Sequence, residues 1–445
     1  MTIALCNGFL YNGDMIRVET EDTLHPANRF VTVHEAARAL NVSPDTIRRW
    51  EKKGLVKAER TANNYRAFKL DELKRAEAKY RGSDGRAFKV LRSRKTRHNV
   101  IELFTGCGGM ALGLENAGLK PELLVDIDKD CVSSLKENRP KWKVIQDDIA
   151  NLDLTGYRGN IDVVAGGFPC QPFSYAGHSR GFDDTRGTLF FEFARCVKEI
   201  QPKLVVAENV RGLVRHDGGR TIATMMNVLN ELGYYVDHQL LRSQFLDVPQ
   251  KRERVFIIGI RKDLEPNFIF PKEKDYTVSL RAALKGCPGS PGSKYPKWKR
   301  EIMDRIPPGG YWRDLPPELQ KQYMKSSYFR AGGKTGMARR LSFDEPSLTL
   351  TCNPAQKHTE RCHPAETRPL TVREYARIQS FPDEWKFTGS TASQYRQVGN
   401  ALPVNMAYHI GRCLIAMLDG ELDPDKMTIR SPRQIMLQQP ILLPV

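Results

Sequence analysis

Residues 99–112 read NVIELFTGCGGMAL, and this stretch decides which fold we expect. Its first residues are mostly apolar, which predicts a buried strand, and the glycines that follow interrupt regular structure. A helical pattern then continues through Leu112 and Leu114. A strand, a glycine loop and a helix in this order let the backbone approach a nucleotide-like ligand at the carboxyl end of the first strand of an α/β sheet.

The glycine loop matches neither common phosphate-binding pattern. Its glycines do not follow the Gly-x-Gly-x-x-Gly spacing of dinucleotide binders, and no Lys-Ser or Lys-Thr pair follows as in a P-loop. Asp126, after the predicted strand 122–125, stands where a carboxylate would accept hydrogen bonds from ribose hydroxyls, and Asp148 ends the next strand. A carboxylate at a strand end is commonly only solvated, so it is the order of these features that carries the signal.

Short apolar stretches recur along the chain at 161–165, 204–207 and 255–259, separated by helix-length segments. This alternation predicts an α/β fold with a mostly parallel, doubly wound sheet over residues 99–260. From 261 to 368 the pattern gives way to Pro, Gly, Lys and Tyr, which indicates a small inserted lobe. Residues 369–420 return to the main domain with a helix at 371–380, and 421–445 form a C-terminal tail.

A single cysteine stands in a rigid loop at residues 166–174, GGFPCQPFS. The prolines on either side of Cys170 keep it out of helix or sheet, so its thiol is available for chemistry. A free cysteine is more often a small buried apolar residue, and an isolated Pro-Cys pair would favour that interpretation.

Composition places the chain among ordinary globular proteins. It has 445 residues, enough for two or three domains, and 40% are hydrophobic. No targeting segment or membrane-spanning apolar run is evident, so we expect a cytoplasmic protein without membrane contact. The 9 cysteines are scattered without a Cys-x-x-Cys pair, which predicts reduced thiols rather than a disulfide framework.

Positive charge is concentrated near the N-terminus. The chain carries a formal charge of +17, and residues 30–98 hold 19 Lys and Arg against 8 Asp and Glu. A polyanion such as nucleic acid is the obvious partner, because neutralising phosphates releases counterions. A basic face can equally be solvated surface, and charge alone does not decide between them.

The basic segment contains a helix-turn-helix pattern. After an N-terminal extension (1–29), a helix at 31–40 and a tight turn precede a second helix that begins at Ser43-Pro44 and stops at Gly54. A strand–turn–strand wing and a charged helix complete residues 30–81, and 82–98 read as a basic linker.

This N-terminal segment resembles the winged helix-turn-helix of the MerR regulator family. The resemblance implies that Arg48, Arg49 and Lys52 face DNA while Ile47 and Trp50 anchor the second helix. A purely structural helical hairpin remains the alternative.

Roughly residues 99–415 resemble the DNA cytosine-5 methyltransferases. Six motifs in family order carry the resemblance: 104–109 (FTGCGG), 169–174 (PCQPFS), 208–210 (ENV), 250–254 (QKRER), 373–382 (REYARIQSFP) and 397–401 (QVGNA). The family's fold is that of S-adenosylmethionine-dependent methyltransferases, with a target-recognition lobe at 261–368.

The chemistry that this resemblance implies needs these residue types. Cytosine C5 is a poor nucleophile, so a thiolate must first add to C6, and Cys170 would supply it. Glu208 would hold or donate a proton at N3. Arg252 would contact the O2 side of the base, and Arg254 would brace the catalytic loop. The alternatives without a catalytic role are that Glu208 is a strand-end carboxylate and that Arg252 and Arg254 are two solvated arginines.

The resemblance also implies a cofactor and a DNA substrate. The base must leave the duplex to be methylated, and Ser174 and Arg186 lie in a loop that would close over DNA. S-adenosyl-L-methionine would contact the following residues: Phe104, Gly106, Gly108, Gly109, Asp126, Ile127, Asp148, Phe168 and Asn400.

We therefore expect an enzyme that methylates C5 of cytosine in a short double-stranded DNA sequence. It would act as a monomer on DNA in a bacterial restriction–modification system, with a cognate endonuclease as functional partner and autoregulation by the N-terminal domain. An RNA cytosine-5 methyltransferase and a transcription regulator with a decayed enzyme lobe are the alternatives. Cys352, His358, Cys362 and His363 fit no structural zinc spacing, so no metal is expected.

Overall fold

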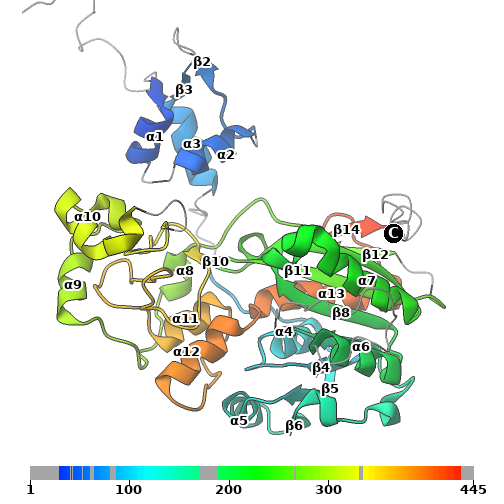
Figure 1. Ribbon diagram of the computed structural model, residues 1–445. Helices are drawn as coiled ribbons and strands as arrows, with labels where there is room; N and C mark the ends of the chain where they lie inside the picture. The colour runs from blue at the N-terminus through cyan, green and yellow to red at the C-terminus, as the bar shows by residue number, and fades with distance from the viewer. Residues whose placement is uncertain are drawn as a thin grey trace, which may run out of the picture. The chain divides into compact units, whose positions relative to one another are not determined.

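The computed structural model describes residues 30–40, 42, 44–52, 54–60, 65–80, 87–169, 189–264, 267–329 and 334–431. The chain divides into two compact units, Met1–Ala78 and Lys79–Val445, which are described separately below (Figure 1). The predicted site residues Cys170, Ser174 and Arg186 lie outside the described residues.

The N-terminal unit is a winged helix-turn-helix, as the sequence predicts. A three-stranded antiparallel sheet, in the order β1-β3-β2, packs with three helices. The elements are β1 (Phe30–Thr32), α1 (Val33–Ala39), α2 (Pro44–Lys52), β2 (Glu59–Arg60), β3 (Arg66–Lys69) and α3 (Leu70–Tyr80).

A capping box and an aromatic core explain why these residues fold locally. The Glu35 N–H donates to Thr32 Oγ1 (3.3 Å), and the Thr32 N–H donates to Glu35 Oε2 (2.8 Å), which starts α1. Ile47 and Trp50, predicted to anchor the second helix, are fully buried with Phe68. The predicted helix at 31–40 begins later than expected, because residues 30–32 pair with β3 instead.

The main unit is built on a seven-stranded sheet in the order β6-β5-β4-β7-β8-β11-β9. Its strands are β4 (Asn99–Leu103), β5 (Lys120–Asp126), β6 (Val144–Gln146), β7 (Val163–Gly166), β8 (Leu204–Val210), β9 (Tyr234–Arg242) and β11 (Glu253–Arg261). Five strands run parallel from β6 to β8, and β11 pairs antiparallel with both β8 and β9. The predicted α/β class is confirmed.

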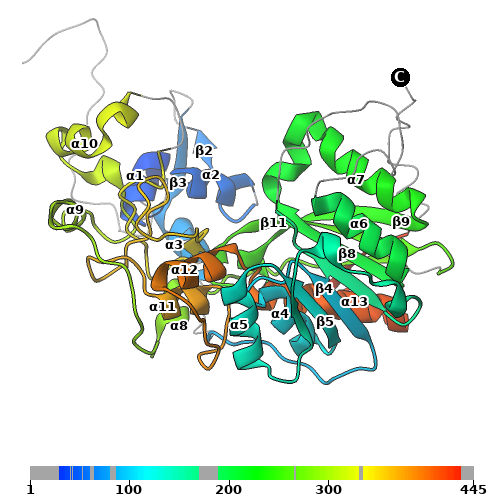
Figure 2. The ribbon, with the colours of Figure 1, turned by 60° about the horizontal axis from the view of Figure 1, so that its bottom comes forward.

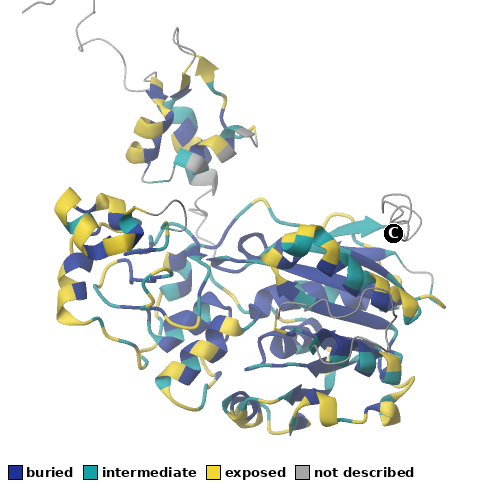
Figure 3. Cartoon of the chain, viewed as in Figure 1, coloured by how far each residue is buried: buried dark blue, intermediate teal, exposed yellow. Residues whose placement is uncertain are grey.

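Helices cover both faces of the sheet (Figure 2). Side chains alternate across each strand: Val100 of β4 packs with α4 (Gly109–Ala117) and α13 (Val404–Asp419), while Ile101 packs with α6 (Leu189–Ile200) and α7 (Arg220–Glu231). Helix α5 (Lys129–Asn138) follows β5 and belongs to a third buried cluster. The central strands β4, β7, β8 and β11 are mostly buried between the layers, whereas β6 and β9 at the edges are more exposed (Figure 3).

The inserted lobe begins later than residue 261. Strand β12 (Phe268–Pro271) pairs antiparallel with β14 (Met427–Arg430), and Phe268 to Phe270 are buried against α13. We therefore assign β12 to the main domain and place the start of the lobe after Pro271.

Two buried clusters organise the lobe. One joins α9 (Lys297–Met303) and α10 (Pro317–Met324), and the other joins α8 (Leu280–Leu284) to α11 (Val372–Ile378) and α12 (Thr391–Asn400). A two-stranded parallel sheet of β10 (Gln250–Lys251) and β13 (Ser347–Leu348) ties the lobe to the motif that precedes β11.

Part of the predicted linker is a component of the main domain. The backbone N–H groups of Ser93 and Thr96 donate to the carbonyls of Asn116 (2.7 Å) and Gly118 (2.8 Å). Asn405 on α13 brackets the same segment, accepting from the Leu91 N–H (3.0 Å) and donating to the Lys89 carbonyl (2.8 Å). Residues 87–98, hereafter the strap, are thus fixed along the domain.

Within the described residues, one helical stretch, Thr391–Asp419, has the length and apolar composition of a membrane span. It consists of α12 and α13, and 72% of its apolar 18-residue window is buried inside the protein. Helix α13 packs against α4 and the sheet, which accounts for its apolar composition as a core helix.

Candidate active site

A cavity of about 770 Å³ opens at the carboxyl edge of the parallel strands. Loops after β4, β5, β6, β7 and β8 form most of its wall, and the lobe closes it with residues 349–352. Ligands of doubly wound sheets bind at this edge. Predicted site residues that line the cavity are Phe104, Gly106, Asp126, Ile127, Asp148, Phe168, Glu208, Arg252, Arg254 and Asn400.

The glycines of the loop after β4 differ in their surroundings. Gly106 has a positive φ of 56°, lines the cavity and has open space where a Cβ would stand. Gly108 and Gly109, predicted to contact cofactor, are not among the cavity-lining residues. A Cβ on Gly109 would lie 2.2 Å from the Leu402 carbonyl, and one on Gly108 would lie 2.7 Å from Leu135. These two glycines permit close packing at the start of α4.

The carboxylate of Asp126 is held in one orientation. It accepts the Gly106 N–H at 2.6 Å on Oδ2 and the Asp128 N–H at 2.8 Å on Oδ1. Burial raises the pKa of Asp126, and these hydrogen bonds act against the rise. The next residue, Ile127, is 67% exposed, which is unusual for isoleucine. Its apolar side chain lines the cavity.

Asp148 and Phe168 also line the cavity. Asp148 caps a short 3₁₀ turn, accepting the Ala150 N–H at 3.0 Å. Phe168 is buried edge-on to Phe104, with ring centroids 6.4 Å apart, and its carbonyl accepts a hydrogen bond from Asn209 Nδ2 at 3.1 Å. The last described residue before Cys170, Pro169, lines the same cavity.

The two arginines of the 250–254 motif have distinct partners. Arg254 Nε lies 2.7 Å from Glu208 Oε1, and both side chains are largely buried. Arg252 is fully buried and donates to the carbonyls of Leu350 and Asn400, each at 3.3 Å. Burial, followed by the charge of Arg254, lowers the pKa of Arg252. Arg254 therefore faces the carboxylate, while Arg252 joins the lobe to the main domain.

Sequence reasoning missed Glu102, which also lines the cavity. Its side chain is 1% exposed, and neither carboxylate oxygen has a hydrogen-bond partner among the described residues. Burial and the nearby charge of Asp126 raise the pKa of Glu102 well above its usual range. A lone acidic residue within the apolar strand 99–103 is the sequence signal that could have indicated it.

The lobe contributes residues 349–352, which sequence reasoning did not select. Cys352 is exposed at the rim, and its Sγ lies 2.9 Å from Asn400 Oδ1. Cys362, considered with it as a zinc ligand, is fully buried with its Sγ directed to the Glu366 carbonyl. The described residues contain no group of three metal-ligating side chains.

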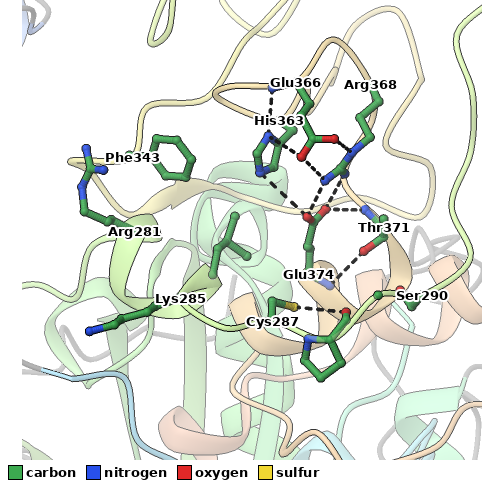
Figure 4. Close-up of a pocket in the computed structure, with 13 residues that line it drawn as sticks. Arg281, Lys285, Cys287, Ser290, Phe343, His363, Glu366, Arg368, Thr371 and Glu374 are labelled. Carbon is green, nitrogen blue, oxygen red and sulfur yellow. Dashed lines mark hydrogen bonds and ion pairs between the residues drawn. The ribbon is translucent and has the colours of Figure 1, made fainter.

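A second cavity, of about 490 Å³, lies between the lobe and α11 (Figure 4). Glu374 on α11 accepts hydrogen bonds from both terminal nitrogens of Arg368, at 2.8 Å each. His363 Nδ1 accepts two backbone N–H groups of the following turn, so the proton of the neutral ring lies on Nε2, 3.8 Å from Glu374 Oε1. Burial lowers the pKa of His363, and this network joins the end of the lobe to α11.

Of the three residues of the N-terminal unit that are predicted to face DNA, the structure describes the side chain of one. Arg48 is exposed on α2, whereas the side chains of Arg49 and Lys52 lie outside what the structure describes. The buried positions of Ile47 and Trp50 turn Arg48 outward from the core.

Fold and cavity together define the class of S-adenosylmethionine-dependent methyltransferases. Residues 98–416 match the model of the C-5 cytosine-specific DNA methylases, and residues 32–68 match that of the MerR family regulatory proteins. The chain belongs to the C-5 cytosine-specific DNA methylase family, so it is a DNA (cytosine-5) methyltransferase that uses S-adenosylmethionine.

Similar proteins support this assignment over most of the chain. The type II methyltransferase M.Eco47II of Escherichia coli is 52% identical over 405 residues, covering 87% of this chain and 96% of the relative. M.PspPI of Psychrobacter sp. (strain TA137) is 49% identical over 409 residues, covering 89% and 98%. Both matches are longer than residues 98–445 could supply, so they include part of the N-terminal region.

A crystal structure described as a prophage-encoded DNA modification methyltransferase of E. coli has the same fold. Its TM-score is 0.54 at 26% identity, covering 72% of this chain and 99% of that chain.

Proposed function

We propose that this enzyme methylates C5 of one cytosine within a specific short duplex sequence, as the modification enzyme of a type II restriction–modification system. The observation that carries the proposal is the Glu208–Arg254 pair, which lines the same cavity as Pro169, the residue that precedes Cys170 in the sequence. Both full-length relatives are named as type II methyltransferases.

The residues around the cavity suit S-adenosylmethionine. Asp126 already binds two backbone N–H groups, so its remaining lone pairs are aligned for the ribose hydroxyls. The exposed face of Ile127 suits the adenine ring, and Asp148 suits its amino group. Glu102 is positioned to receive the α-ammonium of the methionine portion. Bound there, the cofactor supplies a methyl group activated by a sulfonium.

Covalent catalysis gives each protein group a definite step. The Cys170 thiolate attacks C6 of an extruded cytosine, forming a C–S bond and moving electron density to C5 and N3. Glu208 holds a proton at N3, and C5 then accepts the methyl group. Loss of the C5 proton to solvent returns the electron pair to the ring and expels the Cys170 thiolate. Arg186 and Ser174 would cover the extruded nucleotide.

The arrangement of the two arginines supports an exchange of their expected roles. Arg254 stands beside Glu208 inside the cavity, so we assign it to orient the carboxylate and contact the base. Arg252 is occupied by two backbone carbonyls, which suits a bracing role between lobe and domain.

A methyl-transfer assay tests the proposal. Purified protein, duplex DNA of mixed sequence and methyl-labelled cofactor should yield label at cytosine C5, while tRNA should stay unlabelled. Cys170→Ser should abolish turnover and preserve cofactor affinity. Label on tRNA alone, or turnover by Cys170→Ser, would contradict the covalent DNA mechanism.

The N-terminal unit supports a second, regulatory role. Its match to MerR regulators and its exposed Arg48 favour binding to an operator near the gene for this protein. In cells, deletion of residues 1–78 should relieve repression of a reporter under that promoter and leave methylation largely intact. Unchanged reporter expression would contradict autoregulation.

The remaining parts of the proposal concern cellular context. We infer that the enzyme acts in the cytoplasm, as a monomer on DNA, alongside a cognate endonuclease that cuts the unmethylated site. Host DNA from cells expressing the enzyme should become resistant to one endonuclease. Light scattering of the DNA complex should give one protein chain per duplex.

A further inference from the structure

The cavity rim continues into an exposed polar loop. Residues 349–352 line the cavity, and the chain then turns outward through residues 352–359, hereafter the rim loop. Asn353, Gln356 and His358 in this loop are exposed, whereas Pro354 between them is buried. The rim loop therefore presents three polar side chains next to the cavity that accepts the target base.

A buried ion pair supports the rim loop from below. Lys299 Nζ on α9 lies 2.6 Å from Glu360 Oε1 and donates to the carbonyl of Ala355 at 2.8 Å. Glu360 is fully buried and accepts the Tyr323 hydroxyl at 2.6 Å. Breaking such a buried pair is costly, so this base of the loop has little freedom to move.

The backbone of the rim loop is also fixed locally. Asn353 Oδ1 accepts the Ala355 N–H at 2.9 Å, and the Thr359 N–H donates to the Gln356 carbonyl at 3.1 Å. Gly336 packs so closely that a Cβ there would lie 2.3 Å from the His358 carbonyl. Turn hydrogen bonds and close backbone contact together hold one loop conformation.

The exposed ends of these side chains keep free hydrogen-bonding capacity. Among the described residues, no partner is found for Asn353 Nδ2, Gln356 Nε2 or either ring nitrogen of His358. Lys357 differs, because its Nζ donates to the Met324 carbonyl at 3.2 Å. The two amide oxygens each accept one hydrogen bond, Asn353 Oδ1 from the Ala355 N–H and Gln356 Oε1 from the Thr359 hydroxyl at 3.4 Å, and each keeps a second lone pair. An amide donor beside such an acceptor is the pattern that reads the N6 and N7 edge of adenine, and imidazole supplies a single donor or acceptor.

We propose that the rim loop reads base edges beside the target cytosine, with Asn353, Gln356 and His358 as specificity-determining residues. This inference rests on the proposed DNA methylation and names the element that selects its sequence. His358 lies six residues after Cys352 in the chain, a span of at most roughly 20 Å. At about 3.4 Å per base pair, the loop reaches no more than about six pairs from the methylated base.

Methylation of a randomised duplex library tests the proposal. Wild-type enzyme, Gln356→Ala and His358→Ala are each incubated with the library and cofactor, and methylated sites are then sequenced. Each variant should lose roughly 5- to 150-fold discrimination at one base pair, within about six pairs of the methylated cytosine. The affinity for S-adenosylhomocysteine should stay unchanged.

Gln322→Ala provides the matched control, since Gln322 is an exposed glutamine on α10 of the same lobe. It should keep wild-type sequence preference. Methylation by both rim-loop variants with unchanged sequence preference would overturn the proposal, and so would equal relaxation by the control. Absence of methylation by wild-type enzyme on every sequence would instead reject the proposed function.

Discussion

At the scale of single residues, Glu102 is a carboxylate that lines the cavity and is 1% exposed. A buried charge without a partner is costly, and both Glu102 oxygens lack hydrogen bonds to described residues. If the cofactor ammonium completes this site, Glu102→Gln should weaken S-adenosylmethionine binding roughly 10- to 150-fold in calorimetry, the range for a hydrogen bond to a charged group. Binding of 5′-methylthioadenosine, which lacks the ammonium, should be unchanged.

A stability measurement checks the same residue without cofactor. The raised pKa of Glu102 means that the fold favours its protonated form. The stability contributed by protonated Glu102 is fully present below the pKa of the unfolded state, about 4.3. It is lost as pH rises through the pKa of the folded state. The melting temperature of Glu102→Gln, relative to that of the wild type at the same pH, should therefore increase as pH rises. Glu137→Gln, on an exposed pair with Lys386, should show neither effect.

The roles of the two arginines can be separated by kinetics. Arg254→Gln should lower kcat roughly 100-fold or more while leaving cofactor affinity intact, because it removes the group that orients Glu208. Arg252→Gln should mainly lower stability, since two backbone carbonyls lose a buried donor. Single-turnover rates and thermal unfolding of both variants measure this split. Equal loss of stability in both would contradict it.

At the scale of elements, Asp247 fixes the turn that leads into the 250–254 motif. It adopts a positive φ of 57° and binds His409 Nε2 on α13 at 2.8 Å, the Tyr276 hydroxyl at 2.6 Å and Lys274. Burial opposes ionisation, but these hydrogen bonds outweigh it and lower the pKa of Asp247. The ionised carboxylate therefore joins α13, the segment after β12 and the motif.

Asp247→Asn keeps the shape and tolerates the positive φ but removes the charge. We expect a loss of about 2–4 kcal/mol in the free energy of unfolding at neutral pH. A depressed carboxyl pKa contributes stability above the unfolded value of about 3.9, and that contribution is lost as pH falls. The deficit measured by urea unfolding should thus shrink below about pH 4. Asp263→Asn, on an exposed pair with Arg261, should cost little at any pH.

Local patterns in the sequence predict elements better than their pairings. The strand that opens 99–112, the strand at 204–207 and the helix at 371–380 are evident because apolar periodicity and caps are local signals. Strand β9, with its mixed sequence YYVDHQLLR, gave no such signal. Its pairing with β11, and that of β12 with β14, depends on contacts far apart in the chain.

The same limit applies to the candidate site. The family resemblance implies Asp126, Phe168 and Asn400 as cofactor contacts, and all three line one cavity. Asp126 ends β5, Asn400 ends α12, and Phe168 comes shortly after β7. Glu102 is buried without a hydrogen-bond partner among the described residues, and Arg252 and Arg254 have separate partners. Both features depend on side-chain packing across several elements. Sequence spacing carries no information on such contacts.

At the scale of the whole molecule, the contacts of the strap predict where the stable methyltransferase domain begins in the sequence. Contacts from Leu91, Ser93 and Thr96 attach the strap to α4 and α13, and Ser93 Oγ lies 2.8 Å from the Tyr408 hydroxyl. A fragment beginning at residue 87 should keep the stability and methyl-transfer rate of the full chain. A fragment beginning at residue 99 should melt roughly 5–10 °C lower, because several buried hydrogen bonds of about 1 kcal/mol each are lost. Equal melting temperatures of the two fragments would show that the strap contributes nothing to the methyltransferase domain.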